Sequence, residues 1–108
     1  MNRGDIWTAA DGGYASKPRP VLIVQDDRFG GTESVTVVPM TTHAVDAPLV
    51  RVLITADHLS GIAENSYAMV DKVTTVRRAR LGQRTGRITA SQMVHMKRAL
   101  LVFLGLAG

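Results

Sequence analysis

Residues 1–88 carry short runs of apolar and β-branched side chains, separated by residues that favour turns. Val21–Val24 is a continuous apolar run, which is typical of a strand buried on both faces. The run at 34–40 roughly alternates instead, and Pro39 within it predicts an edge position or a bulge. This pattern predicts strands over residues 5–9, 21–24, 34–40, 49–54, 66–76 and 84–88.

After residue 88 the spacing of apolar side chains changes to that of an amphipathic helix. Thr89 followed by Gln92 makes a capping box, and Gly105 is a helix stop. Between them, apolar side chains recur every three or four residues, at Met93, Met96, Leu100, Phe103 and Leu104. A single helical turn, capped by Thr55, is expected at 55–59. Short strands followed by one helix predict a mostly β fold, a small, strongly bent sheet or barrel with the helix packed on it.

The length of 108 residues predicts one domain, 1–108, with a single hydrophobic core. The absence of cysteine excludes disulfides and cysteine-ligated zinc and is typical of a reducing cytoplasm. The longest apolar stretch, Ala99–Leu104, is far too short to span a bilayer. The N-terminus is polar and strand-like, unlike a signal peptide. We therefore expect a cytoplasmic protein without a membrane segment.

The net charge of +4 is unevenly distributed along the chain. Residues 1–71 hold five Lys and Arg against nine Asp and Glu, whereas residues 72–108 hold eight Lys and Arg and no acidic residue. Five arginines and one lysine lie between Lys72 and Arg87. A basic stretch is usually a solvated face, but this density of arginine favours a polyanion or an acidic protein as partner.

Arg19 lies between Pro18 and Pro20 at the entrance of the apolar run 21–24. Proline fixes φ near about −65° and biases the preceding residue toward extended backbone. The guanidinium therefore leaves a stiff backbone, which suits a cation held against a phosphate. The alternative is that the prolines only shape a strand end and that Arg19 is a solvated surface charge.

Three motifs follow one another in a characteristic order: Arg3-Gly4-Asp5-Ile6-Trp7, then Arg19-Pro20-Val21-Leu22-Ile23-Val24 after a glycine-containing loop, then Val37-Val38-Pro39-Met40-Thr41-Thr42. Together they resemble the MazF/PemK family of toxins from bacterial toxin–antitoxin pairs, over nearly the whole chain. The resemblance implies an SH3-like β-barrel of the CcdB/PemK kind with a C-terminal helix, assembled as a homodimer. It also implies a metal-independent endoribonuclease that cleaves single-stranded RNA at short sequences and is blocked by a cognate antitoxin.

The resemblance also implies roles for single residues. Arg19 and Thr41 stand at the family's arginine and threonine that act at the scissile phosphate, and Asp71 stands at a position that is often acidic. The loop Ala10–Lys17 is shorter than is common in the family, which bears on the RNA sequence that is cut. Further RNA contacts are expected from Tyr14, a candidate for base stacking, from Ser16 and Lys17 in the same loop, and from Arg77 and Arg78.

RNA carries its own nucleophile, because the 2′-OH attacks the neighbouring phosphorus and the 5′-oxygen leaves. The enzyme aligns the two oxygens, stabilises charge on the phosphorane and moves protons, and neither a metal nor a cofactor is required. Arg19 suits the charge stabilisation, and the Thr41 hydroxyl suits hydrogen bonding to a non-bridging oxygen. The general base stays open, with Asp71 as base or as orienter of Arg19, and with His43 as an acid. Without the family, Thr41 is only a strand-end threonine and Asp71 only an ion-pair partner of Lys72 or of a barrel arginine.

Two other functions are compatible with this kind of fold. CcdB toxins bind DNA gyrase without catalysis, but they depend on a C-terminal tryptophan motif, and the only tryptophan here is Trp7. An SH3-like nucleic-acid-binding module without chemistry is the third alternative. The sequence has no metal-binding motif and no phosphate-cradling glycine loop. The expected partners are single-stranded RNA and a MazE-like antitoxin, acidic and partly disordered, that complements the arginine-rich second half.

Overall fold

The computed structural model of the protein describes residues 1–10 and 17–107. The strands of this part are β1 (Asp5–Ala9), β2 (Arg19–Ile23), β3 (Ser34–Thr41), β4 (Arg51–Ile54), β5 (Ser66–Met69), β6 (Thr74–Arg77) and β7 (Leu81–Arg87). Its helices are the short 3-10 turns η1 (Asp27–Phe29), η2 (Val70–Lys72) and η3 (Arg78–Arg80), and the α-helix α1 (Ala90–Phe103).

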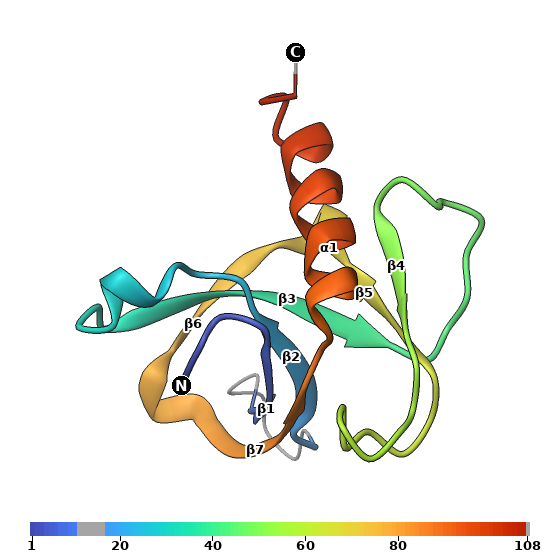
Figure 1. Ribbon diagram of the computed structural model, residues 1–108. Coiled ribbons are helices and arrows are strands. Elements are labelled where there is room, and N and C mark those ends of the chain that lie inside the picture. The colour runs from blue at the N-terminus through green and yellow to red at the C-terminus, as the bar shows by residue number, and fades with distance from the viewer. Residues whose placement is uncertain (11–16, 108) are drawn as a thin grey trace.

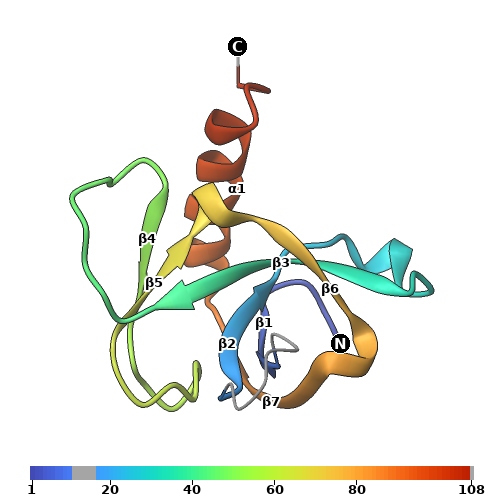
Figure 2. The ribbon, with the colours of Figure 1, turned by 180° about the vertical axis from the view of Figure 1, so that it is seen from behind.

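The strands form one bent antiparallel sheet around β3 (Figures 1 and 2). On one side of β3 lies β2, followed outward by β1 and β7. On the other side β3 pairs first with β6 and then with β5, and β4 lies beyond β5. Because η3 joins β6 directly to β7, the sheet curls back on itself, although no ladder joins these two strands in the described part of the chain. The predicted mostly β, barrel-like fold with a C-terminal helix is confirmed.

Pro39 lies in the interior of the sheet, so the prediction of an edge position is wrong. It pairs with Val21 of β2 on one side. On the other side the ladder to β6 ends at Val37 and the ladder to β5 begins at Met40. The missing N–H of Pro39 therefore falls at the point where β3 changes partner, where no ladder bond is needed.

The predicted strand 66–76 is interrupted by η2. β5 and β6 pair with different halves of the same side of β3, so the chain has to bend between them. The bend is held by the N–H of Val70, which donates to the Val50 carbonyl (2.9 Å), and by the N–H of Val73, which donates to the Val70 carbonyl (3.1 Å). Asp71 consequently lies in a 3-10 turn and not in a strand.

Residues 55–61 form a turn without the predicted helix, and its cap is Asp57 in place of Thr55. The Asp57 carboxylate accepts hydrogen bonds from the backbone N–H groups of Leu59 (2.9 Å) and Ser60 (2.8 Å). A short aspartate side chain competes well for nearby backbone donors, and this local competition replaces the first turn of a helix.

Two apolar clusters lie on opposite faces of the sheet. The inner cluster, within the curl, contains Ala9, Val21, Ile23, Val35 and Val37, with Trp7, Val76 and Leu81 against it. The outer cluster lies between the sheet and α1 and contains Ile6, Leu22, Val38, Met40, Ile54, Ala68, Val70, Ile88, Met96 and Ala99. Side chains alternate along each strand, so neighbours such as Val21 and Leu22 belong to different clusters. This division explains the continuous apolar run of β2.

The helix α1 begins with the predicted capping box. Thr89 Oγ1 accepts from the Gln92 N–H (3.0 Å), and Gln92 Oε1 accepts from the Thr89 N–H (2.8 Å). Its first half packs on the sheet, but Phe103 and Leu104 are 43% and 54% exposed. In Figure 1 the C-terminal end of α1 projects beyond the sheet, so the barrel core covers only part of the predicted apolar face.

Candidate functional site

Arg19 is the first residue of β2 and its side chain is exposed. Its backbone is in register with Ala9 at the end of β1, and that of Pro20 with Thr8. Pairing with β1 and the flanking prolines both restrict the backbone at this position. The guanidinium therefore leaves a fixed point at the end of the sheet and reaches solvent.

Thr41 is the last residue of β3 and is half-buried. Its backbone is in register with Tyr67 of β5. The hydroxyl oxygen accepts a hydrogen bond from the backbone N–H of His43 (3.1 Å). Because this bond occupies a lone pair, the hydroxyl proton remains available for donation to another group.

Arg19 and Thr41 lie at the ends of two paired strands, β2 and β3. Val21 pairs with Pro39, and Ile23 pairs with Val37. This ladder ends at Val21 and Pro39, and Arg19 and Thr41 each lie two residues beyond it, at the same end of the two strands. Alternation assigns both residues to the face of the inner cluster.

Asp71 forms an ion pair with an arginine of β4. Its carboxylate receives two hydrogen bonds from Arg51 of β4, at 2.8 Å from Nε and 3.1 Å from Nη2. The side chains of Arg51 and Asp71 are 12% and 31% exposed. The hydrogen bonds from Arg51 hold the pKa of Asp71 below its ordinary value, and those bonds also raise the pKa of Arg51. The pair ties β4 to η2, and the catalytic role of Asp71 stays a prediction.

Arg51 is the residue that sequence reasoning missed at this point. It precedes Asp71 by 20 residues, and only the pairing of β4 with β5, which sets Arg51 opposite Met69, brings the two side chains together. An arginine within an apolar run carries no local signal for such a partner.

The predicted RNA-binding residues are spread over different parts of the chain. Tyr14 and Ser16 lie outside the described residues, and Lys17 is exposed two residues before Arg19. Arg77, exposed at the end of β6, lines a hollow of about 430 Å³ with Ala10, Ser34, Thr75, Val76 and Arg80. Ala10 follows the residue that pairs with Arg19, so this hollow begins beside the end of β1.

Arg78 has a different environment from Arg77. Its Nε donates to the Thr32 carbonyl, and its Nη2 donates to the Phe29 carbonyl (3.5 Å) and to Thr32 Oγ1 (3.4 Å). These contacts fasten the connection between β2 and β3 to η3. The RNA-binding role of Arg78 stays a prediction, and the observed contacts are structural.

Within residues 1–10 and 17–107, no three His, Cys, Asp or Glu side chains gather into a candidate metal site. The helices of the same residues include none with the length and apolar character needed to cross a membrane.

Comparison with known proteins bears on what this arrangement does. Residues 2–104 match the family described as the PemK-like, MazF-like toxin of type II toxin–antitoxin systems. The chain belongs to this PemK/MazF toxin family. The family resemblance drawn from the motifs at 3–7, 19–24 and 37–42 is thereby confirmed.

Individual members of the PemK/MazF family agree in length and fold. The chain is 58% identical over 109 residues to the probable endoribonuclease MazF of Mycolicibacterium smegmatis, and the match covers all of both proteins. A mycobacterial endoribonuclease solved in complex with its cognate antitoxin has a TM-score of 0.81 at 25% identity, covering 100% of this chain and 98% of that one. The Mycobacterium tuberculosis toxin MazF-mt6 has a TM-score of 0.80 at 27% identity, with 96% and 99% covered.

Proposed function

We propose that this protein is the toxin of a type II toxin–antitoxin pair and cleaves single-stranded RNA at the site formed by Arg19 and Thr41. The observation that supports the proposal is the β2–β3 register, in which Val21 pairs with Pro39, because Arg19 and Thr41 each follow two residues beyond that pair at the same end of the sheet. Membership of the PemK/MazF family and the likeness to proteins named as endoribonucleases support the RNA-cleaving alternative over gyrase binding.

Arg19 acts as the charge stabiliser of the proposed reaction. The 2′-OH of the substrate gives its proton to water and attacks phosphorus, the bond to the 5′-oxygen breaks, and that oxygen takes up a proton from water, which leaves a 2′,3′-cyclic phosphate and a 5′-hydroxyl. Negative charge grows on the non-bridging oxygens in the transition state, and a planar guanidinium binds two such oxygens in parallel. Arginine keeps its proton in proteins, so its contribution is electrostatic and not that of a base.

Thr41 completes the binding of the phosphate. Its oxygen already accepts the His43 N–H (3.1 Å), which orients the hydroxyl so that its proton points to a further acceptor. In the proposed complex that acceptor is a non-bridging phosphate oxygen. Lys17 and Arg77 extend the cationic surface on either side along the RNA, and the reaction uses no metal or cofactor.

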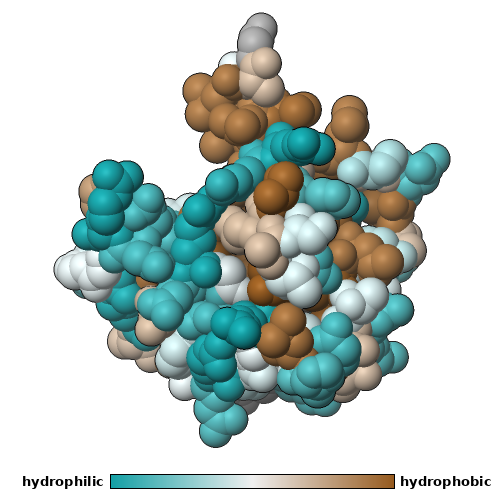
Figure 3. Space-filling view, viewed as in Figure 1, coloured by the Kyte–Doolittle hydropathy of each residue, from teal (hydrophilic) through white to brown (hydrophobic). Residues whose placement is uncertain are grey.

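The proposed assembly has two further parts. A homodimer is supported by the apolar residues left exposed at the end of α1 and near β4, namely Leu49, Leu53, Leu101, Val102, Phe103, Leu104 and Leu106. Figure 3 shows hydrophobic surface over the projecting end of the molecule, and contiguous apolar surface that is exposed is typical of an interaction site. The second part is a cognate antitoxin, supported by the mycobacterial complex named above. Cleavage of cellular RNA by this toxin implies the cytoplasm as its compartment.

Cleavage of a long RNA in EDTA tests the proposal. Wild-type protein should give site-restricted fragments with 2′,3′-cyclic phosphate ends. Arg19→Ala should lower the rate about 10²–10³-fold, as loss of one charge-stabilising donor does, and Thr41→Val should lower it while Thr41→Ser retains most of it. Arg98→Ala removes an exposed arginine on α1 and serves as the matched control. Uncut RNA with wild-type protein, or an equal loss in Arg98→Ala, would refute the assignment.

A further inference from the structure

A hollow of about 260 Å³ lies next to the proposed cleavage site. Thr8, Pro20 and Thr42 line it on the strand side, and residues 61–64, in the connection between β4 and β5, also line it. Glu64 is the only charged residue among the described residues that line this space. We call it the Glu64 hollow.

The Glu64 hollow adjoins the proposed cleavage site on two strands. Pro20 directly follows Arg19, and Thr42 directly follows Thr41. Consecutive Cα atoms are about 3.8 Å apart, so the hollow begins one residue from the proposed site on both strands. Side chains alternate along a strand, which puts Pro20 on the face of the sheet opposite to Arg19. A nucleobase is joined to its phosphate through a single ribose, so a base next to the cut phosphate can turn around the end of the sheet into this space.

The backbone that carries Glu64 is held in place on both sides. Gly61 has a φ of +69°, and its position leaves no room for a Cβ against the Thr85 carbonyl of β7. Asn65 Oδ1 accepts the backbone N–H of Ala56 (2.7 Å), just beyond the end of β4. A binding group on a backbone fixed in this way loses little freedom when it contacts a ligand.

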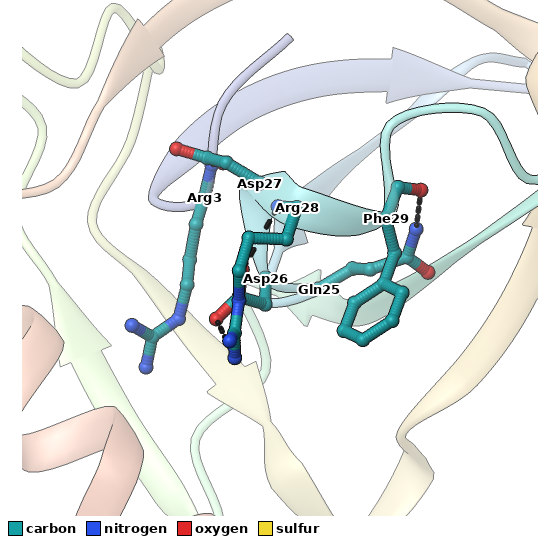
Figure 4. A network of polar contacts seen from close by, with 6 residues as sticks. All are labelled: Arg3, Gln25, Asp26, Asp27, Arg28 and Phe29. Atoms are coloured by element: carbon teal, nitrogen blue, oxygen red, sulfur yellow. Dashed lines mark hydrogen bonds and ion pairs between the residues drawn. The ribbon is translucent and has the colours of Figure 1, made fainter.

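The carboxylate of Glu64 is not neutralised by the protein. Within residues 1–10 and 17–107, Glu64 forms no ion pair. Other carboxylates have a nearby arginine: Figure 4 shows Asp26 bound to Arg28, with Oδ1 3.1 Å from Nε, and Asp71 is bound to Arg51. Glu64 is exposed, so its two oxygens are available to a hydrogen-bond donor from outside.

The chemistry of the Glu64 hollow excludes phosphate and favours a neutral donor. A carboxylate accepts hydrogen bonds and repels phosphate oxygens. The exocyclic amino groups of adenine, cytosine and guanine are neutral donors, and glutamate is a known acceptor for the amino group of cytosine. Uracil has a carbonyl oxygen where cytosine has that amino group. Pro20 and Ile62 add apolar surface, which suits the face of an unstacked base.

We propose that the Glu64 hollow binds one nucleobase of the RNA next to the cut phosphate and selects a base with an exocyclic amino group over uracil. Glu64 accepts a hydrogen bond from the amino group, while Pro20 and Ile62 pack against the base. The inference rests on the proposed function and makes Glu64 a specificity-determining residue. Because the carboxylate also repels the phosphates of any RNA, it lowers the affinity for bases that cannot donate to it.

Two DNA hexanucleotides, one of deoxycytidine and one of deoxyuridine, provide the test. Both lack the 2′-OH and stay uncut, and their affinities are measured by the anisotropy of a fluorescein label. Wild-type protein should bind the deoxycytidine strand about tenfold more tightly. Glu64→Gln replaces one acceptor by a donor that can bind the uracil oxygen, so the ratio should fall below about twofold through tighter binding of the deoxyuridine strand.

The matched control is Glu33→Gln. Glu33 is the only other glutamate of the chain, is also exposed, and precedes the end of β3 that is opposite to Thr41. This variant should keep the wild-type ratio of affinities. Equal affinities of the two strands for wild-type protein, an unchanged ratio in Glu64→Gln, or the same change in both variants would overturn the proposal.

A cationic protein segment is the competing occupant. A labelled hexalysine peptide that loses affinity with Glu64→Gln, while the ratio of the two DNA strands stays constant, would identify such a segment and overturn the proposal. Cleavage of a long RNA is mapped separately. Wild-type protein should avoid uracil at one position next to the cut, and Glu64→Gln should accept it there. Failure of wild-type cleavage refutes the proposed function alone, because the affinities for DNA are measured without cleavage.

Discussion

A substitution at Asp71 distinguishes a catalytic role of this carboxylate from a structural role. The substitution Asp71→Asn keeps the size of the side chain and removes its charge. Asp71 receives two hydrogen bonds from Arg51 and lies four residues beyond Tyr67, the partner of Thr41. We expect the variant to lose stability through the broken ion pair and to keep nearly all of its rate of RNA cleavage.

The two roles of Asp71 predict very different rates. Loss of a general base typically lowers the rate about 10²–10⁴-fold. If Asp71 is structural, it affects the reaction only through the electrostatic interaction of its charge with the transition state. Two strand residues and two 3-10 residues place it roughly 11 Å from the position that pairs with Thr41. A unit charge at that distance in water contributes about 0.4 kcal/mol, which is about twofold in rate.

The assay measures initial cleavage rates in EDTA together with thermal midpoints. Asp71→Asn and Arg51→Gln should lower the midpoint by similar amounts, and the double variant should lower it by less than the sum, because each single change removes the same interaction. Cleavage should stay within about twofold of wild type in all three when assayed well below the midpoint. A loss of 100-fold or more in Asp71→Asn with an unchanged midpoint would refute this reasoning and assign the proton transfer to Asp71.

Three further outcomes follow from particular contacts. A Cβ at Gly86 would lie 2.2 Å from the Leu59 carbonyl oxygen, so Gly86→Ala should lower the free energy of unfolding by about 1–3 kcal/mol. As a control, Gly31→Ala, where a Cβ would meet open space, should change the free energy of unfolding by less than about 0.5 kcal/mol. Equal denaturation midpoints of the two variants would contradict the predicted clash. Hydrogen bonds from Ser60 and Leu59 lower the pKa of Asp57 below its ordinary 3.8, so the contribution of Asp57 to stability is present above that pH and is lost as the pH falls further. In an acid titration, Asp57→Asn should therefore lose less stability than wild type as the pH falls. Parallel curves of stability against pH for the two proteins would exclude this contribution of Asp57. Phe103→Glu should turn the proposed homodimer into a monomer in sedimentation equilibrium, whereas an unchanged mass would remove the exposed end of α1 from the interface.

Local sequence signals predicted the fold wherever one short stretch decides the structure. The run 21–24 and the capping box of Thr89 are complete within a few residues, and both elements form as expected. Non-local pairing decided the remainder. Residues 66–76 have the sequence pattern of one continuous strand. In the structure, however, β5 pairs with the end of β3 and β6 pairs with its beginning, so the chain has to bend at η2 between them.

The candidate site divides in the same way. Arg19 and Thr41 are recognisable because each stands at the end of a motif that fixes a strand, and the register of those strands then follows from their apolar faces. The environment of Asp71 is not recognisable in this way, because its ion-pair partner, Arg51, comes from a strand 20 residues earlier. A sequence assigns residues to strand ends more readily than it assigns partners across a sheet.

The arginine-rich stretch between residues 72 and 87 is not one surface in the folded protein. Arg77 lines the hollow beside the end of β1, Arg78 donates hydrogen bonds to the connection between β2 and β3, and Arg84 and Arg87 line a separate hollow at the start of α1. Strand alternation and the turn η3 produce this division, since neighbours in sequence leave the backbone in different directions.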